Sequence, residues 1–532
     1  MPGLFVPALA LGVMGMFLYQ VVAYFTSPLK HIPGPFWAKV TDLWRFIDHY
    51  NATQPITQRA LHDQLGPAVR IGPNAVSLSD PSLLKTIYST RGHFLKSDFY
   101  TVNDAVQDGH LIQNVFGTRS NAFHGKYMRP IQKLYIMTSI LTMEPLIDRT
   151  INSLCEQLET RFMTGKNAGK TCDIADWIGY YAWDVVGEIT FSQPFGFLKS
   201  GTDIKNMIHT AESIMHYFGI VGQIPTLDKF LGKNPYSPIK LPTFANAAGF
   251  CAQRLRERLS TPDLEKGQGQ KDFLARFLEA KQQYPDVVGD NEVIGYLLLN
   301  VSVSRPIEAS NKIRVPLLTR YKMLAGADTT AITLKAIVYF VLRNPQVYQK
   351  LRAELDAANL TFPAAYDDAR KLTYLEAVIQ ETLRIHPPVG NVLERVVPQS
   401  GLTLPDGRTI APGTIVGMNQ WVVTRNKDLF GEDVDTFRPE RWLCGEDESE
   451  EEYAVRVKKM KDADFSFGGG NRICTGRFLA TAELFKVTST LFSKYDMELE
   501  DPSQEWTVRL WWFVFVDNIK VKISPRALKL SQ

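Results

Sequence analysis

The stretch from Phe467 to Gly476 constrains this chain of 532 residues more than any other part of it. It has the sequence FGGGNRICTG, so three glycines precede a cysteine, and an apolar run with helical spacing follows from Phe478 to Phe485. Glycines let a backbone approach a flat partner closely, and the start of a helix favours the thiolate form of a cysteine. We therefore expect Cys474 to be a thiolate ligand at the start of a helix.

The residues around this cysteine indicate what the thiolate binds. Gly476 removes a side chain from the first helical turn, which leaves room for a bulky planar group. Arg472 offers a cation to an acidic edge of that group. A planar, acidic, thiolate-ligated group indicates haem. The alternative is a small buried cysteine beside a glycine-rich turn, the usual place of an intracellular cysteine.

Together these positions resemble the Phe-x-x-Gly-x-Arg-x-Cys-x-Gly signature of the cytochrome P-450 family, the haem-thiolate monooxygenases, at every fixed position. The resemblance implies a mainly α-helical fold with a small β subdomain. It also implies haem b with its iron bound by Cys474, and cofactor contacts from Phe467, Gly468, Arg472 and Gly476. Because the chain has no Rossmann or flavin-binding fingerprint, we expect NADPH electrons to arrive through a separate NADPH-cytochrome reductase.

Composition excludes several other classes of protein. Hydrophobic residues make up 45% of the chain and the net charge is only +3, with no basic run interleaved with aromatic residues, so nucleic-acid binding is not expected. The five cysteines are odd in number and contain no Cys-x-x-Cys pair. Neither a disulfide framework nor a zinc site is therefore indicated.

Residues 1–27 predict a transmembrane anchor. The stretch from Leu4 to Phe25 is uncharged, apolar and about long enough to cross a bilayer, and Lys30 and His31 follow it. It lacks a basic start and a convincing cleavage site, which favours an anchor over a cleaved signal peptide. Residues 28–40 contain a stiff proline-rich hinge that resembles the hinge of microsomal family members. We expect a single-pass protein of the endoplasmic reticulum membrane, with residues 41–532 as one cytosolic haem-thiolate domain.

Beyond the hinge, helical periodicity dominates to about Asp356, for example over 141–162 and 174–191. Residues 392–422 and 506–523 are rich in β-branched and aromatic residues and predict strands. The acidic run from Glu446 to Glu452 predicts a solvated loop.

A predicted helix from Lys371 to Ile385 contains Glu381 and Arg384, which lie three apart and can pair on one face. A solvated ion pair of little energetic value is the plain alternative. Arg441, in the sequence Phe-Arg-Pro-Glu-Arg-Trp, resembles the second half of the family's Glu-x-x-Arg and Pro-Glu-Arg network. The resemblance implies that the three residues form a buried structural cluster that holds the loop presenting Cys474.

The segment from Leu324 to Thr330 places a glycine and two threonines inside a helical pattern. Thr329 can hydrogen-bond back to the carbonyl of Ala325, which bends a helix or opens a groove. The segment resembles the family's oxygen-activation motif, in which Asp328 would relay protons from solvent and Thr329 would hydrogen-bond the activated oxygen. A slightly imperfect core helix is the alternative.

Further cations are candidates for the haem propionates. Arg395 follows the helix of Glu381 at a position where the family commonly places an arginine against a propionate. Near residue 124 the family usually has Trp or His followed four residues later by Arg, but here residue 128 is Met. His124 and Arg129 are therefore candidate ligands, and a surface histidine is the equal alternative.

Residues Val301 to Lys322 interrupt what is one long helix in the family, supplied here by Glu292–Asn300 and Met323–Arg343. The interruption contains Pro306 and Pro316, each of which costs a helix ~3 kcal/mol or more, so it cannot lengthen the helix. One explanation is a loop that covers or damages the pocket. We favour the other, a retained intron in the gene model, because the residues at its ends can be encoded by splice signals in the required order.

The function that we expect is a membrane-anchored monooxygenase that hydroxylates or O-demethylates a lipophilic small molecule. Residues 129–131, 137–140 and 174–197 are similar to fungal members near the pisatin demethylase group, which implies specialised metabolism or detoxification of aromatic compounds. The predicted pocket walls, residues 100–123, 388–392 and 513–515 with the helix near Ala325, are mostly apolar.

The reductase is expected to dock where a cluster of cations could meet an acidic partner, namely Lys458, Lys459, Lys461 and Arg477. Two other functions stay open. A haem-thiolate isomerase or dehydratase would need no reductase and usually lacks the acid–threonine pair. A catalytically impaired haem-binding protein is the third possibility, and only the interruption at 301–322 favours it.

Overall fold

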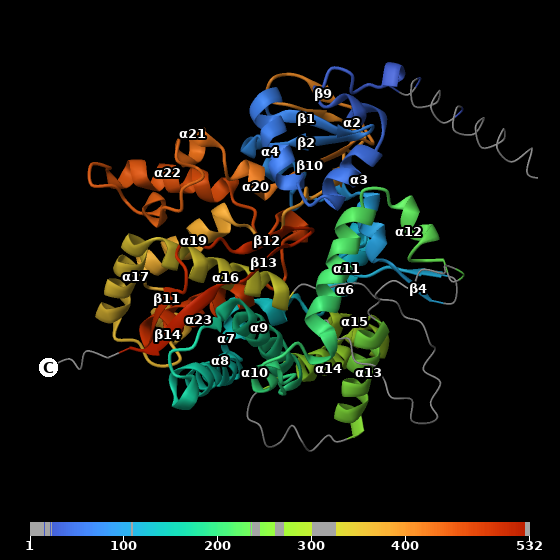
Figure 1. Ribbon diagram of the computed structural model, residues 1–532. Helices are drawn as coiled ribbons and strands as arrows, with labels where there is room; N and C mark the ends of the chain where they lie inside the picture. The colour runs from blue at the N-terminus through green and yellow to red at the C-terminus, as the bar shows by residue number, and fades with distance from the viewer. Residues whose placement is uncertain are drawn as a thin grey trace, which may run out of the picture.

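Helices predominate over strands in the residues that the computed structural model describes, which are 24–107, 110–234, 245–260, 271–300 and 326–526 with Gly15, Val22 and Tyr236 (Figure 1). The α-helices are α2 (Phe36–Val40), α3 (Leu43–Tyr50), α4 (Gln54–Leu65), α5 (Leu84–Ile87), α6 (Asn121–Met128), α7 (Met137–Leu141), α8 (Glu144–Leu158), α9 (Ile174–Phe191), α10 (Phe197–Ser200), α11 (Met207–Val221), α12 (Thr226–Phe230), α13 (Ala245–Ser260), α14 (Phe273–Gln283), α15 (Asp290–Asn300), α16 (Ala327–Arg343), α17 (Pro345–Ala358), α18 (Tyr366–Ala369), α19 (Thr373–Ile385), α20 (Gln420–Val423), α21 (Lys427–Phe430), α22 (Glu450–Ala463) and α23 (Arg477–Lys494).

The strands form small sheets. They are β1 (Ala68–Gly72), β2 (Ala75–Leu78), β3 (Leu95–Lys96), β4 (Ala105–Gln107), β5 (His110–Ile112), β6 (Cys172–Asp173), β7 (Arg395–Val396), β8 (Leu402–Thr403), β9 (Thr409–Ile410), β10 (Ile415–Met418), β11 (Tyr495–Leu499), β12 (Thr507–Leu510), β13 (Val514–Asp517) and β14 (Lys520–Pro525). The largest sheet has the order β1-β2-β10-β7-β3. Of the strands predicted over 392–422, β7 and β10 thus pair with strands from the first hundred residues, at one end of the molecule, whereas β8 and β9 pair with each other (Figure 1).

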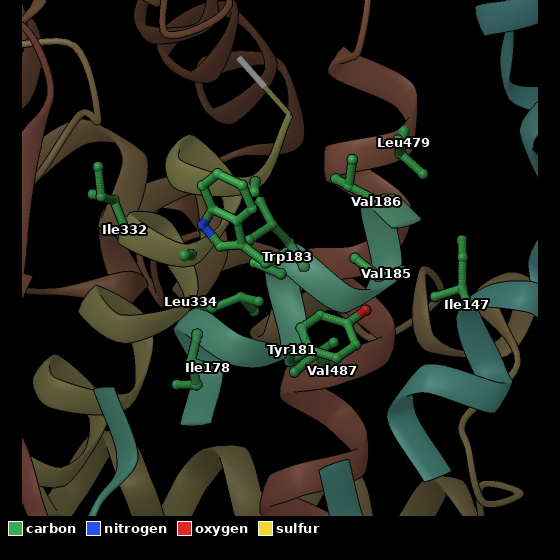
Figure 2. Packing of buried hydrophobic residues seen from close by; sticks show 14 of the residues in the cluster. Ile147, Ile178, Tyr181, Trp183, Val185, Val186, Ile332, Leu334, Leu479 and Val487 are labelled. Carbon is green, nitrogen blue, oxygen red and sulfur yellow. The ribbon is translucent and has the colours of Figure 1, made fainter. Parts of the chain in front are cut away.

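Helix α9 lies at the centre of the helical part. It buries 16 of its 18 residues, as expected of a helix that is apolar around most of its circumference. Figure 2 shows Tyr181 and Trp183 of α9 among side chains from neighbouring helices, including Leu334 of α16 and Val487 of α23. The predicted helix over 174–191 is therefore the core of the fold.

The acidic run from Glu446 to Glu452 was wrongly predicted as a loop throughout, because α22 begins at Glu450. Ser449 and Glu452 form a reciprocal capping box, in which each side chain accepts a hydrogen bond from the other residue's backbone N–H. Carboxylates in a first helical turn also stabilise the positive end of the helix dipole. The acidic run thus starts a helix.

The predicted anchor at 1–27 lies almost wholly outside the described residues, and the interruption at 301–322 lies entirely outside them. Within the described ranges, no helix combines the length and apolarity needed to cross a bilayer.

The two described ends that flank the interruption meet in space. Asn300 is the last residue of α15, and Gly326 is the residue that precedes α16. A Cβ atom placed on Gly326 would lie 2.9 Å from the carbonyl oxygen of Asn300. The chain therefore returns at Gly326 to the place that it leaves after Asn300.

Glu381, Arg384 and Arg441 form a buried ion network. The Glu381 carboxylate is fully buried and accepts five hydrogen bonds: two from Arg384 (2.7 and 2.8 Å), and one each from Arg441 (3.3 Å), the Trp442 indole (2.9 Å) and the Arg438 backbone N–H (3.0 Å). A buried charge with this many partners is well compensated. Loss of the carboxylate would leave the buried Arg384 guanidinium without a carboxylate partner among the described residues, whereas Arg441 would keep its ion pair with Asp433 (2.9 Å).

The network is linked to the cysteine segment through α20. The Thr424 hydroxyl at the end of α20 donates to the Arg384 carbonyl oxygen (2.9 Å). At the start of α20, the Gln420 side chain accepts from the Phe465 backbone N–H (3.1 Å) and donates to the Ser466 hydroxyl (3.1 Å). The next residue, Phe467, begins the cysteine segment. The network thus fixes the entry to that segment.

We predict that Glu381→Ala destabilises the fold by about 3–5 kcal/mol, because it leaves the buried Arg384 charge unpaired, and that the purified protein lacks the expected haem. Thermal unfolding and haem stoichiometry measure the two effects. Glu376→Ala is the matched control, because its carboxylate lies on the same helix but 3.7 Å from the exposed Lys461. Full haem content in Glu381→Ala would refute the structural role of the network.

Candidate active site

The cysteine segment is a tight loop that leads into α23. Gly468 and Gly470 have positive φ values of 71° and 60°, and a Cβ on Gly470 would lie 2.3 Å from the Tyr88 carbonyl oxygen, so both positions require glycine. The Cys474 backbone N–H donates to the Phe467 carbonyl oxygen (2.7 Å), which closes the loop. Helix α23 begins at Arg477, three residues after the cysteine.

The environment of Cys474 suits a metal-bound thiolate. Burial raises the pKa of the thiol, whereas hydrogen bonds from the Gly476 and Arg477 backbone N–H groups and the Arg477 charge lower it. The Cys474 side chain is nevertheless accessible at its surface. A side chain that is surrounded by protein and still accessible is expected where a residue lines an internal cavity. A Cβ on Gly476 would meet no atom within 4 Å, as expected if this glycine faces the same cavity.

Basic side chains gather around Arg472, two residues before the cysteine. Burial together with the charge of Arg395 lowers the pKa of Arg472 to about 10. Burial, then the charges of Arg472 and Lys96, lower the pKa of His124 to about 4. The structure thus brings together three residues predicted for the propionates, Arg395, His124 and Arg472, and adds Lys96.

Lys96 was not predicted from the sequence. Its strand β3 pairs with β7 so that Lys96 lies directly opposite Arg395, an arrangement of like charges that is unfavourable by itself. Burial, with Arg395 and Arg472, lowers the pKa of Lys96 well below its usual value. Its ammonium group lies over the rings of Tyr100 (4.2 Å) and Phe116 (4.1 Å). The only local signal is that Lys96 is a lone cation in an aromatic segment.

The neighbouring acid does not neutralise this cluster. The two carboxylate oxygens of Glu394 accept from Arg45 (2.8 Å) and from the Ser97 hydroxyl (2.5 Å). The cluster therefore fits a group that brings its own negative charges, and the two propionates of haem are such charges. Cys474 would bind its iron, and Arg395, Arg472, His124 and Lys96 would hold its acidic edge.

Arg129 is exposed at the C-terminal end of α6, while His124 is half-buried in the same helix. Five helical positions separate the two side chains by about 140° around the helix axis, so they face different directions. Met128 occupies the position one turn after His124 and is buried. The role of Arg129 at a propionate stays a prediction.

Asp328 lies in the first turn of α16 and is 5% exposed. Its Oδ1 accepts a hydrogen bond from the Trp183 indole N–H (3.2 Å), whereas no described residue donates to its buried Oδ2. Burial, and then the charge of Glu212, raise the pKa of Asp328 to about 7. A carboxyl group with this pKa can both accept and donate protons near neutral pH.

Thr329 follows Asp328 and is half-buried. Its carbonyl oxygen accepts from the Thr333 hydroxyl (3.0 Å), and the Thr330 hydroxyl donates to Gly326 (3.3 Å), so threonine back-bonding occurs at the start of this helix. The predicted bond from Thr329 to Ala325 lies outside the described residues, as does the expected pocket wall near Ala325. The role of Thr329 stays a prediction.

Comparison with known proteins identifies the arrangement. The family model described as Cytochrome P450 matches residues 33–523. The chain is 35% identical over 518 residues to cytochrome P450 monooxygenase cfoH of Aspergillus candidus, covering 97% of this chain and 92% of that protein. It is 38% identical over 478 residues to a cytochrome P450 monooxygenase of Aspergillus terreus, covering 88% and 90% of the two chains. The chain belongs to the cytochrome P450 family and is a haem-dependent monooxygenase that receives its electrons from a reductase partner.

Proposed function

We propose that this monooxygenase uses NADPH electrons to hydroxylate or O-demethylate a lipophilic small molecule in the specialised metabolism or aromatic detoxification of a fungus. One atom of dioxygen enters the substrate and the other leaves as water. Its relatives include monooxygenases of Aspergillus and Emericella species, which supports a fungal setting. The similarity of residues 129–131, 137–140 and 174–197 to the pisatin demethylase group supports O-demethylation as one of the proposed reactions.

Bound haem supplies the chemistry of dioxygen activation, and the chain supplies position and protons. Cys474 would bind the iron and donate electron density to it, and the cluster of Lys96, His124, Arg395 and Arg472 would orient the cofactor. Asp328 holds a proton at Oδ2 and exchanges it near neutral pH. Thr329 stands next to it as the hydrogen-bonding hydroxyl.

The observation that favours a monooxygenase over an isomerase or dehydratase is the buried Asp328, whose Oδ2 has no hydrogen-bond partner among the described residues. Monooxygenation consumes protons that must cross a protein interior, whereas rearrangement of a peroxide consumes none. A buried carboxyl group with one oxygen left without a donor is destabilising by itself, so a proton-handling role accounts for its presence.

A lipophilic substrate is supported by the meeting of two predicted pocket segments. Val389 forms a bridge with Phe513, and the Gly390 N–H donates to the Trp512 carbonyl oxygen (3.1 Å). Trp512 packs against Phe99 (5.2 Å between ring centroids) and Phe218 (4.8 Å). Such aromatic surfaces bind apolar ligands in preference to charged ones.

Reductase docking is proposed at the face formed by α22 and the start of α23. Lys458, Lys459 and Lys461 are exposed on α22. Arg477 donates to the Cys474 carbonyl oxygen (3.3 Å), so this face lies next to the cysteine loop. An acidic partner bound here would deliver electrons on the cysteine side of the haem.

With a reductase, NADPH and isotopically labelled dioxygen, we predict that the holoenzyme transfers one labelled oxygen atom to a member of a panel of apolar methoxyarenes and phenols. Asp328→Asn should lower the rate about 100-fold at unchanged haem content, because proton transfer is impaired. Asp290→Asn is the control, since Asp290 also lies in the first turn of a helix but pairs with Lys281 at the surface. Consumption of a hydroperoxide without NADPH would instead support the isomerase or dehydratase. Absence of any turnover would support the catalytically impaired haem-binding protein.

Attachment to the endoplasmic reticulum membrane is proposed from the apolar N-terminal residues together with an exposed face that follows them. Leu43, Ile47 and Tyr50 lie three or four residues apart on α3 and are 50%, 48% and 65% exposed. Phe36 and Trp37 on α2 are 60% and 62% exposed. Figure 1 shows α2 and α3 close together at the same end of the molecule. Exposed Trp and Tyr side chains beside an anchor are typical of a membrane interface.

We predict that the full chain stays in the microsomal pellet after alkaline carbonate extraction, because a hydrophobic span is not released by high pH. Protease added from the cytosolic side should digest the catalytic part, since the anchor is expected to leave that part in the cytosol. Release into the supernatant would contradict the anchor. Protection from the protease would contradict its orientation.

We also propose that residues 301–322 are an insertion into a single long helix, read through from an intron. Removal of these 22 residues would leave three residues between Asn300 and Gly326. Gly326 would then be the fourth residue after Asn300, the spacing of an α-helical hydrogen bond, and the two residues already lie in contact. Val293, Tyr296 and Leu297 on the buried side of α15 would then continue into the buried side of α16.

A chain lacking 301–322 should fold and bind haem at least as well as the full chain, because α15 and α16 would join in register. Deletion of 301–320 is the register control: two extra residues rotate α16 by about 200°, so haem binding should be lost. Equal behaviour of both deletions would contradict a continuous helix. Sequencing of the mature transcript tests the intron directly. A messenger RNA that encodes residues 301–322 would contradict the retained intron.

A further inference from the structure

The carboxylate of Asp328 is held from one side only. Its Oδ1 accepts a hydrogen bond from the Trp183 indole N–H at 3.2 Å. Its Oδ2 is buried and has no donor among the described residues. The two oxygens are therefore chemically distinct: one is fixed, and the other is left for exchange.

Trp183 is rigid enough to fix that oxygen. It lies in the middle of α9 and is 1% exposed. Its ring packs on Phe197 (5.7 Å between centroids), and Asp184 holds Phe197 in place by accepting from the Phe197 N–H (3.1 Å) and the Leu198 N–H (2.9 Å). Figure 2 shows the indole on the side of α9 that faces α16. The indole N–H is thus held toward the first turn of α16.

Charged groups around Asp328 do not replace this bond. Glu212 of α11 opposes ionisation of Asp328, and Lys335 of α16 favours it. Both are committed elsewhere: Glu212 pairs with Arg509 of β12 (3.0 Å), and Lys335 with Asp517 of β13 (3.4 Å) and the Val516 carbonyl oxygen (3.2 Å). Arg509 and Asp517 in turn pair with each other. The neutral indole is thus the group that orients the carboxylate.

We propose that Trp183 is a positioning residue of this monooxygenase: its indole N–H binds Oδ1 of Asp328 and thereby presents Oδ2 as the oxygen that exchanges protons. This inference rests on the proposed proton-handling role of Asp328. It predicts that removal of the N–H changes the acidity and the orientation of Asp328 without removing the acid.

The first test measures the acidity of Asp328 through stability rather than activity. Because Asp328 is protonated up to about pH 7 in the folded chain but ionises near its ordinary value when unfolded, the stability of the holoenzyme relative to Asp328→Asn should fall with pH and level off near pH 7. In Trp183→Phe the charged carboxylate loses a hydrogen bond, so the levelling point should move upward by about one pH unit. An unchanged levelling point would overturn the proposal.

The second test is a double-mutant cycle on the reconstituted holoenzyme, with NADPH consumption as the probe. Trp183→Phe should lower the rate about tenfold in the wild-type background and have no further effect in Asp328→Asn, because it acts through the acid. Trp183→His, which keeps a ring N–H, should restore part of the rate. Independent, additive effects would overturn the proposal.

Trp177→Phe is the matched control, because Trp177 is a buried indole of the same helix that packs edge-to-face on Tyr180 and Phe162. It should behave as wild type in both tests, and a shift equal to that of Trp183→Phe would overturn the proposal. If Trp183→Phe does not retain haem, Trp183→His and Trp183→Gln decide, since both can donate to Asp328. If Asp328→Asn itself has no effect on turnover, the proposed function fails rather than the role of Trp183.

Discussion

The buried carboxylate of Glu381 is the interaction on which the geometry of the site depends. Its five donors come from its own helix, α19, and from residues 438–442, which lie far from it in sequence. A buried ion in such a set has one favourable arrangement, because any donor that moves away leaves charge uncompensated. Through Thr424 and Gln420 that arrangement extends to Phe467, whose carbonyl oxygen accepts from the backbone N–H of Cys474, the residue that we propose binds the iron.

The active site itself has the opposite electrostatic character. The charges of Arg395 and Arg472 oppose protonation of Lys96, those of Arg472 and Lys96 oppose protonation of His124, and the neighbouring acid, Glu394, is bound by Arg45 and Ser97. Asp328 is a buried acid with one oxygen that has no partner in the part of the chain that the structure describes. Each feature is unfavourable in the chain alone and is explained by what the reaction brings, namely the haem propionates and the protons consumed with dioxygen. The network around Glu381 thus stabilises the segment that leads to the cysteine loop, whereas the residues of the active site are arranged for the reaction.

The parts of this account that follow from the sequence are local in the chain. The cysteine loop, the pair Glu381 and Arg384, and the helix over 174–191 depend on spacings of a few residues, and those spacings are visible in the sequence. Arg395 and His124 could be named from resemblance. The resemblance also implied that they meet Arg472 at the cofactor, and the structure brings the three residues together from separate elements.

The parts that were missed depend on contacts between distant residues. Lys96 lies with the other basic residues because β3 pairs with β7, about three hundred residues later in the chain. The hydrogen bond from Trp183 to Asp328 joins two helices and spans 145 positions in the sequence. The strands β1 to β3 were not predicted, because each is short and is defined by its partners in the sheet. The acidic run at the start of α22 was misjudged because charge was weighed without the capping residue Ser449.

The measurement that tests the central claim most directly is the optical spectrum of the reduced, carbon-monoxide-bound protein, recorded for the wild-type chain and for Cys474→Ser. A thiolate opposite carbon monoxide shifts the main band far to the red, because sulfur donates electron density through the iron. We expect the red-shifted band in the wild-type protein and its loss in Cys474→Ser, in which the thiolate is replaced by a hydroxyl. An unshifted band in the wild-type protein, or the same shifted band in Cys474→Ser, would contradict ligation by Cys474 and the site built around it.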